Sequence, residues 1–269
     1  AVTFYLLFLI VPLFVFPETS ELFEFNKMVL TYITTTFVVG FWIAKCIFKK
    51  TFVFRRTPLD IPLVIFLTSQ AISTLLSIDT RTSFLGYYSR FHGGFLSSIS
   101  YALLYWGYVS NMDYEKTTKA VRFVFVSTFI TSIWAIFEHY GHSFSCLIFP
   151  GFRTFDVSCW VQDVQNRVYS TFGQPNWLAA WLVAIIPLTW ALALNPKFKT
   201  QNLKLNSKSF WIYILLSAVL FITLLYTKSR SGLLAFVISF VTFWGLVILI
   251  SKDILRKNIL VFLLTTCYL

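Results

Sequence analysis

Charged residues are scarce in this chain: Asp, Glu, Lys and Arg together make up 12% of its 269 residues. A soluble domain carries roughly 25% charge, so this shortage excludes a water-soluble globular protein. Hydrophobic residues make up 57% and form runs of about 18 to 22 residues, long enough to cross a hydrocarbon core of roughly 30 Å as helices. Because a helix satisfies its own backbone in lipid, the expected fold class is all-α, a polytopic transmembrane helix bundle.

The apolar runs predict about eight to nine membrane spans. The first and last runs are shorter than the roughly 20 residues that a perpendicular crossing needs. We expect a single transmembrane helical domain over residues 1–269, with spans at residues 2–16, 28–48, 59–76, 94–110, 120–138, 175–194, 210–227, 232–251 and 258–269.

The net charge of +11 does not indicate a nucleic-acid partner, because the basic residues fall in short clusters between apolar runs. Every second loop is rich in lysine, and such loops lie in the cytoplasm under the positive-inside rule. The alternation predicts a cytoplasmic N-terminus. The loops expected in the cytoplasm are 49–57, 111–119 and 195–209, and those expected outside are 17–27, 77–93, 139–174 and 228–231.

Cysteine is rare as well, and the four cysteines follow no metal-ligand spacing, so no metal site is expected. Cys46 and Cys267 lie in apolar runs, where a thiol packs as a small hydrophobe. Cys146 and Cys159 share the external loop 139–174, in an oxidising compartment that permits a disulfide. The alternative is a pair of free thiols.

Ionisable residues are nearly missing from the middles of the predicted spans. Ion-coupled transporters and proton relays usually need acidic residues or histidine at that depth. Their shortage counts against a secondary transporter. It leaves a polyprenyl-glycan flippase or a similar lipid transporter as an alternative, although a flippase should line a central cavity with charges from several span interiors.

The segment TKSRSG at 227–232 breaks the positive-inside rule by placing Lys228 and Arg230 between two spans on the expected outer side. The pair could simply anchor a tight turn, with both side chains reaching the interface. As a functional alternative it forms an anion clamp, because arginine presents a planar fork that matches phosphate oxygens. The helix that follows also favours an anion at its N-terminus.

Two other external segments repeat this pattern. The sequence NRVYSTFGQPN places Arg167 and Asn176 at the start of the span 175–194, and GYYSRFHGG places Arg90 and His92 before an earlier span. Each segment could be a structured loop, and His92 either a base or phosphate contact or a surface imidazole without a role. A lipid-linked diphosphate would present its charge at this depth, where fixed cations could stabilise it as a leaving group.

Four blocks, in this order along the chain, resemble those of the O-antigen ligase/polymerase superfamily of bacterial envelope glycosyltransferases. They are ELFEFNK at 21–27, S-x-D…G-x-x-x-R-x-x-G-G at Ser77–Gly94, RVYSTFGQPN at 167–176 and TKSRSG at 227–232. The last two blocks are moderately specific together, and the resemblance covers most of the chain.

This resemblance implies a multi-pass glycosyltransferase of the bacterial inner membrane, which needs no cofactor. It would move a glycan from an undecaprenyl-diphosphate carrier to an acceptor glycolipid, glycan or protein on the outer face, within lipopolysaccharide or other polysaccharide biosynthesis. Arg167 and Arg230 match arginines that grip the carrier diphosphate, with Arg90 as a further candidate and Lys228, His92 and Asn176 in support. The blocks do not determine which acceptor is preferred, so O-antigen ligase and polymerase of the same superfamily remain alternative activities.

The family's large outer loop and catalytic histidine normally follow several spans after the last block, and no match to them precedes Leu269. We therefore expect the chain to be the N-terminal portion of a longer protein, and its catalytic base is unknown. Taken alone, the chain is expected to bind a lipid diphosphate without transferring a glycan.

Overall fold

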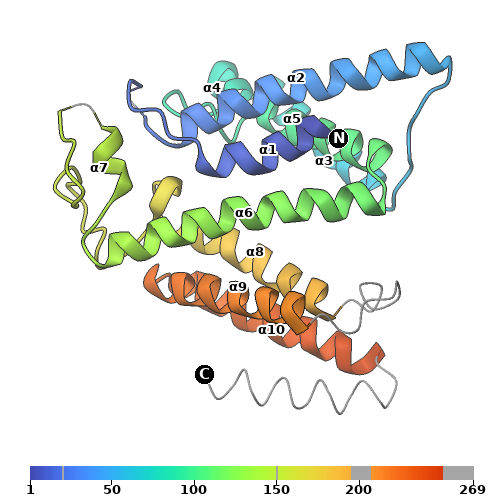
Figure 1. Cartoon of the computed structure of the whole chain (residues 1–269). Helices are drawn as coiled ribbons and strands as arrows, with labels where there is room; N and C mark the ends of the chain where they lie inside the picture. Colours follow the sequence, from blue (N-terminus) through green and yellow to red (C-terminus); the bar gives the residue numbers. More distant parts are fainter. Residues whose placement is uncertain (20, 150, 195–206, 251–269) are drawn as a thin grey trace. The chain divides into compact units, whose positions relative to one another are not determined.

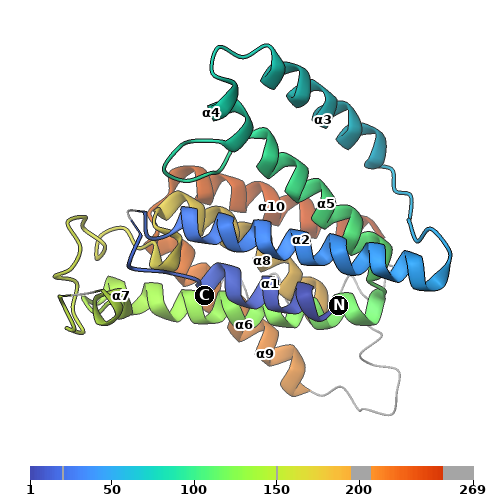
Figure 2. The same ribbon diagram turned by 90° about the horizontal axis from the view of Figure 1, so that it is seen from above.

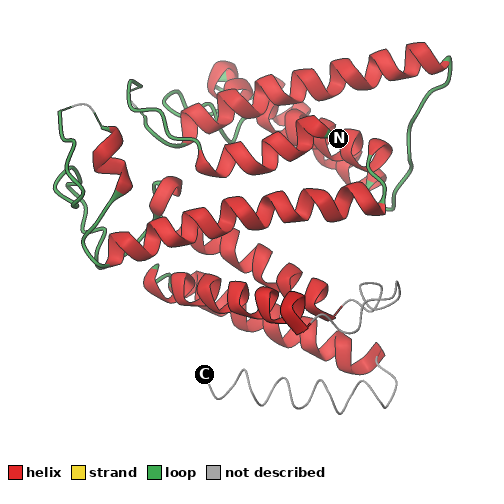
Figure 3. Ribbon diagram, viewed as in Figure 1, coloured by secondary structure: helices red, strands yellow, loops and turns green. Residues whose placement is uncertain are grey.

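The computed structural model describes residues 1–19, 21–149, 151–194 and 207–250. Within these ranges every regular element is a helix (Figure 3). The chain divides into two compact units, Ala1–Gln174 and Pro175–Leu269. The expectation of one domain over residues 1–269 is not tested by this division, and the two units are described separately below.

Within its described residues, unit 1 contains two long helices, three of intermediate length and three short ones. α1 packs against α6 and α2, and α2 packs against α5 (Figure 1). Figure 2 shows α3 and α4 on the far side of α5. The elements are α1 (Val2–Leu13), α2 (Glu24–Lys49), α3 (Asp60–Leu75), α4 (Thr80–Leu85), α5 (Phe95–Asn111), α6 (Tyr114–His139), α7 (Phe144–Ile148) and the 3-10 turn η1 (Ser170–Phe172).

The contact between α2 and α5 depends on a small residue. A Cβ atom at Gly107 of α5 would lie 2.8 Å from a methyl carbon of Val38 on α2, so a glycine is what lets the two helices approach. Phe4, Val38, Met112 and Ala120 form a buried cluster beside this contact. Close packing of this kind, rather than the hydrophobic effect, holds helices together in lipid.

Unit 2 contains α8 (Pro175–Leu194), α9 (Ser207–Tyr226) and α10 (Arg230–Ile250). α8 packs against both other helices. Its side chains Leu178, Leu182 and Ile186 follow a helical spacing of four residues and are fully buried. A Cβ atom at Gly232 would lie 2.6 Å from the Cβ of Ala179, so the first turns of α8 and α10 lie side by side.

Four helices are long and apolar enough to cross a membrane: Glu24–Lys49, Tyr114–His139, Pro175–Leu194 and Arg230–Leu249. The segments Val2–Leu13, Asp60–Leu75 and Phe210–Tyr226 are apolar but shorter. These helices indicate a multi-pass membrane protein in a lipid bilayer. Eight or nine spans are not confirmed, and the last expected span, 258–269, lies outside the described residues.

Within the described residues, the predicted apolar runs coincide with helices, and the differences lie at their ends. The helix expected at 120–138 begins at Tyr114, so the expectation of a loop through 111–119 is wrong. Asp113 caps this helix by accepting the backbone N–H of Lys116 at 2.9 Å. Hydropathy did not detect this first turn because its residues are polar. The short helix α4 was missed for the same reason, and α7 was missed because its five residues are far too few for an apolar run that spans a membrane.

The loops of unit 1 separate into two groups at opposite ends of its helices. At one end, called here the basic end, the backbone N–H of Arg55 donates to Ser110 at 3.1 Å and Lys45 donates to Asn111 at 2.7 Å. At the other, called the long-loop end, Arg90 pairs with Glu24. The lysine-rich loops 49–57 and 111–119 therefore share one end of unit 1, as their alternation along the sequence requires. Which end faces the cytoplasm stays a prediction.

The orientation can be tested with single cysteines in a background that lacks Cys46 and Cys267. We expect Tyr88→Cys, at the long-loop end, to react with an impermeant maleimide in intact cells, and Thr51→Cys, at the basic end, to react only after lysis. Both positions are exposed. Labelling of Thr51→Cys alone in intact cells would reverse the orientation, and labelling of both would refute the separation of the two ends.

The long-loop end contains a disulfide between Cys146 and Cys159, whose Cα atoms lie 5.4 Å apart. Cys146 belongs to α7, so the bond ties that helix to the following loop. Because it closes a loop of 13 residues, the chain-entropy model gives it a stabilisation of about 3 kcal/mol.

We expect the Cys146→Ser/Cys159→Ser double variant to unfold at a lower temperature or denaturant concentration than the parent, by about that free energy. Mass spectrometry of unreduced peptides should show residues 146 and 159 joined. Alkylation of both thiols without prior reduction would contradict the bond.

Candidate functional site

The polar centre of the long-loop end is the carboxylate of Glu138, near the last turn of α6. It is completely buried. The backbone N–H of Ser170 donates to Glu138 Oε2 at 2.8 Å, and the hydroxyl of Ser143 donates to Oε1 at 3.3 Å. A buried carboxylate is stable only when such donors replace water, so Glu138 fixes the backbone on both sides of the external loop.

The segment that follows Arg167 is folded tightly onto α1 and α2. Thr171 is fully buried, and its hydroxyl donates to the carbonyl oxygen of Pro12 at 2.6 Å. The ammonium of Lys27 donates to the carbonyl oxygen of Thr171 and lies 4.6 Å from the centre of the Phe172 ring. Lys27 thus connects α2 directly to the candidate arginine loop.

Two backbone positions in this segment require positive φ. Ser170 has φ 52° and Gly173 has φ 74°. A Cβ atom at Gly173 would lie 2.5 Å from the ring of Phe23, so glycine is needed for both conformation and space. Tyr169 is also buried; desolvation, followed by the nearby charge of Glu138, raises the pKa of its phenol and keeps it neutral.

The segment 86–92 reaches the same end. Arg90 Nε lies 3.0 Å from Glu24 Oε2, and the hydroxyl of Tyr32 donates to the carbonyl oxygen of Phe91 at 2.6 Å. The Phe25 and Phe91 rings are 5.5 Å apart. The carboxylate of Glu24 therefore holds Arg90 in place. The Arg90 guanidinium also lies 6.0 Å from the centre of the Tyr87 ring.

The structure places the other candidates of unit 1 as follows. Arg167 is exposed and lies three residues before the anchored Ser170, and His92 is exposed two residues after Arg90. His139 and His142 each donate the N–H of Nδ1 to a backbone carbonyl oxygen of the external loop, His139 to that of Gln165 and His142 to that of Phe155. Both rings thus take part in loop structure.

In unit 2, Arg230 and Lys228 are exposed in the turn between α9 and α10, and Lys228 has φ 47°. Ser229 is buried, and its hydroxyl accepts the N–H of Gly232 at 3.1 Å, which caps α10. Asn176 is exposed in the first turn of α8. Because the first turns of α8 and α10 are neighbours, Asn176 and Arg230 lie at the same end of unit 2.

The predicted clamp between Arg167 and Arg230 joins residues of different units, and it stays a prediction. Sequence reasoning gave no role to Lys27 or Glu138, which hold the long-loop end together. Lys27 did carry a signal, since it is a lysine at an end where the positive-inside rule does not place one. Glu138 is the last residue of the predicted span 120–138, but hydropathy could not show that it is buried.

Among the described residues, no group of three or more His, Cys, Asp or Glu side chains is arranged to hold a metal ion. No protein-family model, curated protein or solved structure matches the chain.

The anchoring role of Glu138 gives a prediction. Glu138→Ala leaves the buried N–H of Ser170 without its acceptor, which costs about 1–3 kcal/mol. Glu138→Gln leaves an amide oxygen that can accept this N–H, so this variant should lose less free energy of unfolding. Unfolding in detergent measures both.

Glu115→Ala is the matched control, since Glu115 lies in the same helix with 82% of its side chain exposed. Its stability should change by less than about 0.5 kcal/mol. If Glu138→Ala were no more destabilising than this control, Glu138 would not anchor the external loop.

Proposed function

We propose that the protein is a membrane glycosyltransferase of the O-antigen ligase type. It would move a glycan from an undecaprenyl-diphosphate carrier to an acceptor on the outer face of the bacterial inner membrane, with its N-terminus in the cytoplasm. One observation carries the proposal beyond the sequence blocks. Three of the four blocks, far apart in sequence, contact one another at the long-loop end through the pairs Glu24–Arg90 and Lys27–Thr171.

The chemistry would be electrostatic. As the acceptor hydroxyl attacks the anomeric carbon, the bond to the diphosphate oxygen breaks and negative charge grows on the leaving group. An exposed guanidinium beside a rigid backbone can meet that charge with two parallel N–H donors. Anchoring of the Arg167 loop by Glu138 and Lys27 would set the arginine's position before the substrate arrives.

The matching polymerase activity would use the same donor site with a growing glycan as acceptor. A flippase would instead move the whole lipid-linked glycan without cleaving it. Purified protein in vesicles, supplied with a lipid-diphosphate glycan and an acceptor glycolipid, distinguishes transfer from a flippase. Release of free undecaprenyl diphosphate marks transfer, and movement of intact substrate between leaflets marks a flippase. Glycan on the acceptor glycolipid marks a ligase, and a lengthened lipid-linked glycan marks a polymerase.

The arginine fork is the testable element. Arg230→Lys keeps the charge but loses the planar pair of donors. We expect it to reduce glycan transfer by the full-length gene product about 10- to 100-fold, the equivalent of a charge-assisted hydrogen bond. We expect Arg167→Lys to reduce glycan transfer by a similar factor.

Arg153→Lys is the control, because Arg153 is an exposed arginine of the external loop that has no assigned role at the diphosphate site and undergoes the same exchange. Its transfer rate should stay within a factor of about three. Equal rates for Arg230→Lys and the parent protein would remove Arg230 from the diphosphate site.

A further inference from the structure

A pocket of about 260 Å³ opens at the basic end of unit 1, remote from the long-loop end along α2 and α6. Its polar lining comprises Lys45 of α2, Asn111 at the end of α5 and Lys116 in the first turn of α6, together with Ala1 and Thr3 at the start of α1. The pocket is smaller than the roughly 300–1,000 Å³ typical of sites for drug-sized ligands. It therefore suits one small polar group rather than a whole soluble cofactor.

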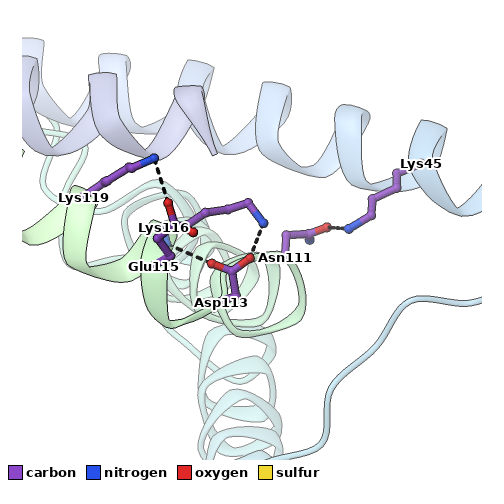
Figure 4. Close-up of polar contacts among 6 residues, drawn as sticks. All are labelled: Lys45, Asn111, Asp113, Glu115, Lys116 and Lys119. Carbon is purple, nitrogen blue, oxygen red and sulfur yellow. Dashed lines mark hydrogen bonds and ion pairs between the residues drawn. The ribbon is translucent and has the colours of Figure 1, made fainter. Parts of the chain in front are cut away.

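The charges around the pocket favour an anion. Lys45 Nζ donates to the amide oxygen of Asn111 at 2.7 Å (Figure 4). That acceptor is neutral, so this bond orients the lysine without cancelling its charge. Lys116 pairs with the exposed carboxylate of Asp113 on the rim. Figure 4 shows Asn111 between Lys45 and Lys116, with Lys119 turned instead toward Glu115.

The walls of the pocket are apolar, and this favours a lipid over a free anion as the ligand. Phe4, Val38, Phe41 and Trp42 line it below the lysines. Phe41 is 62% exposed, and one turn away on the same face of α2 Phe37 is 57% exposed and stacked on it. An apolar strip thus continues from the pocket along a membrane-crossing helix. A soluble phosphate would not use this strip, whereas an acyl chain would cover it.

We propose that this pocket binds the phosphodiester of an anionic phospholipid, with Lys45 and Lys116 at the phosphate and an acyl chain along Phe41 and Phe37. Basic pockets between transmembrane helices commonly take lipid headgroups in this way. The proposal does not depend on glycosyl transfer. Its failure would leave the proposed function untouched, because the two sites lie at opposite ends of unit 1.

The test uses native mass spectrometry of the purified chain in detergent, titrated with dioleoyl phosphatidylglycerol or dioleoyl phosphatidylcholine. We expect the parent protein to bind the first phosphatidylglycerol molecule more tightly than phosphatidylcholine. Lys45→Gln/Lys116→Gln should weaken phosphatidylglycerol binding about 30-fold, roughly the loss of one cation–phosphate attraction for each lysine.

Lys49→Gln/Lys119→Gln is the matched control, since it removes two charges from the same end of the bundle but not from the pocket. It should keep the affinity of the parent protein. An equal loss in both double variants, or equal binding of the two lipids by the parent, would overturn the proposal. So would competition by inorganic phosphate at the same concentration as the lipid, which would identify a free-phosphate site.

A photoactivatable phosphatidylglycerol gives a second measurement that needs no lysine variant. With the parent protein, cross-links should map to α2 between Phe37 and Lys45. Cross-links spread evenly over the apolar helices would mean that the lipid surrounds the protein without occupying a site. The proposal would then fail, whether or not the lysine variants fold.

Discussion

The long-loop end of unit 1 depends on one buried carboxylate. Glu138 accepts the N–H of Ser170 and the hydroxyl of Ser143 in a place without access to water. If these donors were lost, the carboxylate would remain buried without a hydrogen-bond partner. The free-energy cost of such a buried group is larger than the net stabilisation that the hydrogen bonds give. The loop after α6 must therefore return to α6 at Ser170, and this return positions Arg167 and Thr171.

The two ends of unit 1 are built for different environments. At the basic end, lysines outnumber their carboxylate partners and sit above apolar walls, as suits an interface with anionic lipid. At the long-loop end, cations are engaged one by one: Arg90 by Glu24, and Lys27 by the carbonyl oxygen of Thr171. The exposed Arg167 lies three residues before Ser170, in a segment whose backbone is bonded to both α6 and α2.

Much of the fold could be predicted from apolar periodicity. The run at 175–194 coincides with α8 residue for residue. The Cys146–Cys159 disulfide is one of the two alternatives that the sequence left open for the two cysteines of the external loop. Periodicity fails where polar residues continue a helix, as in the first turn of α6, where the Asp113 cap decides the boundary. It also cannot show burial. Nothing in the sequence around Glu138 distinguishes a carboxylate bonded inside the protein from one at the membrane surface.

The central claim is that the long-loop end binds a lipid-linked diphosphate. The most direct measurement is a cryo-electron microscopy map of the protein in nanodiscs with undecaprenyl diphosphate. The account predicts diphosphate density beside the segment 167–173, with the Arg167 guanidinium about 3 Å from a phosphate oxygen. Diphosphate density at the basic end, or a long-loop end that stays empty at saturating lipid, would contradict it.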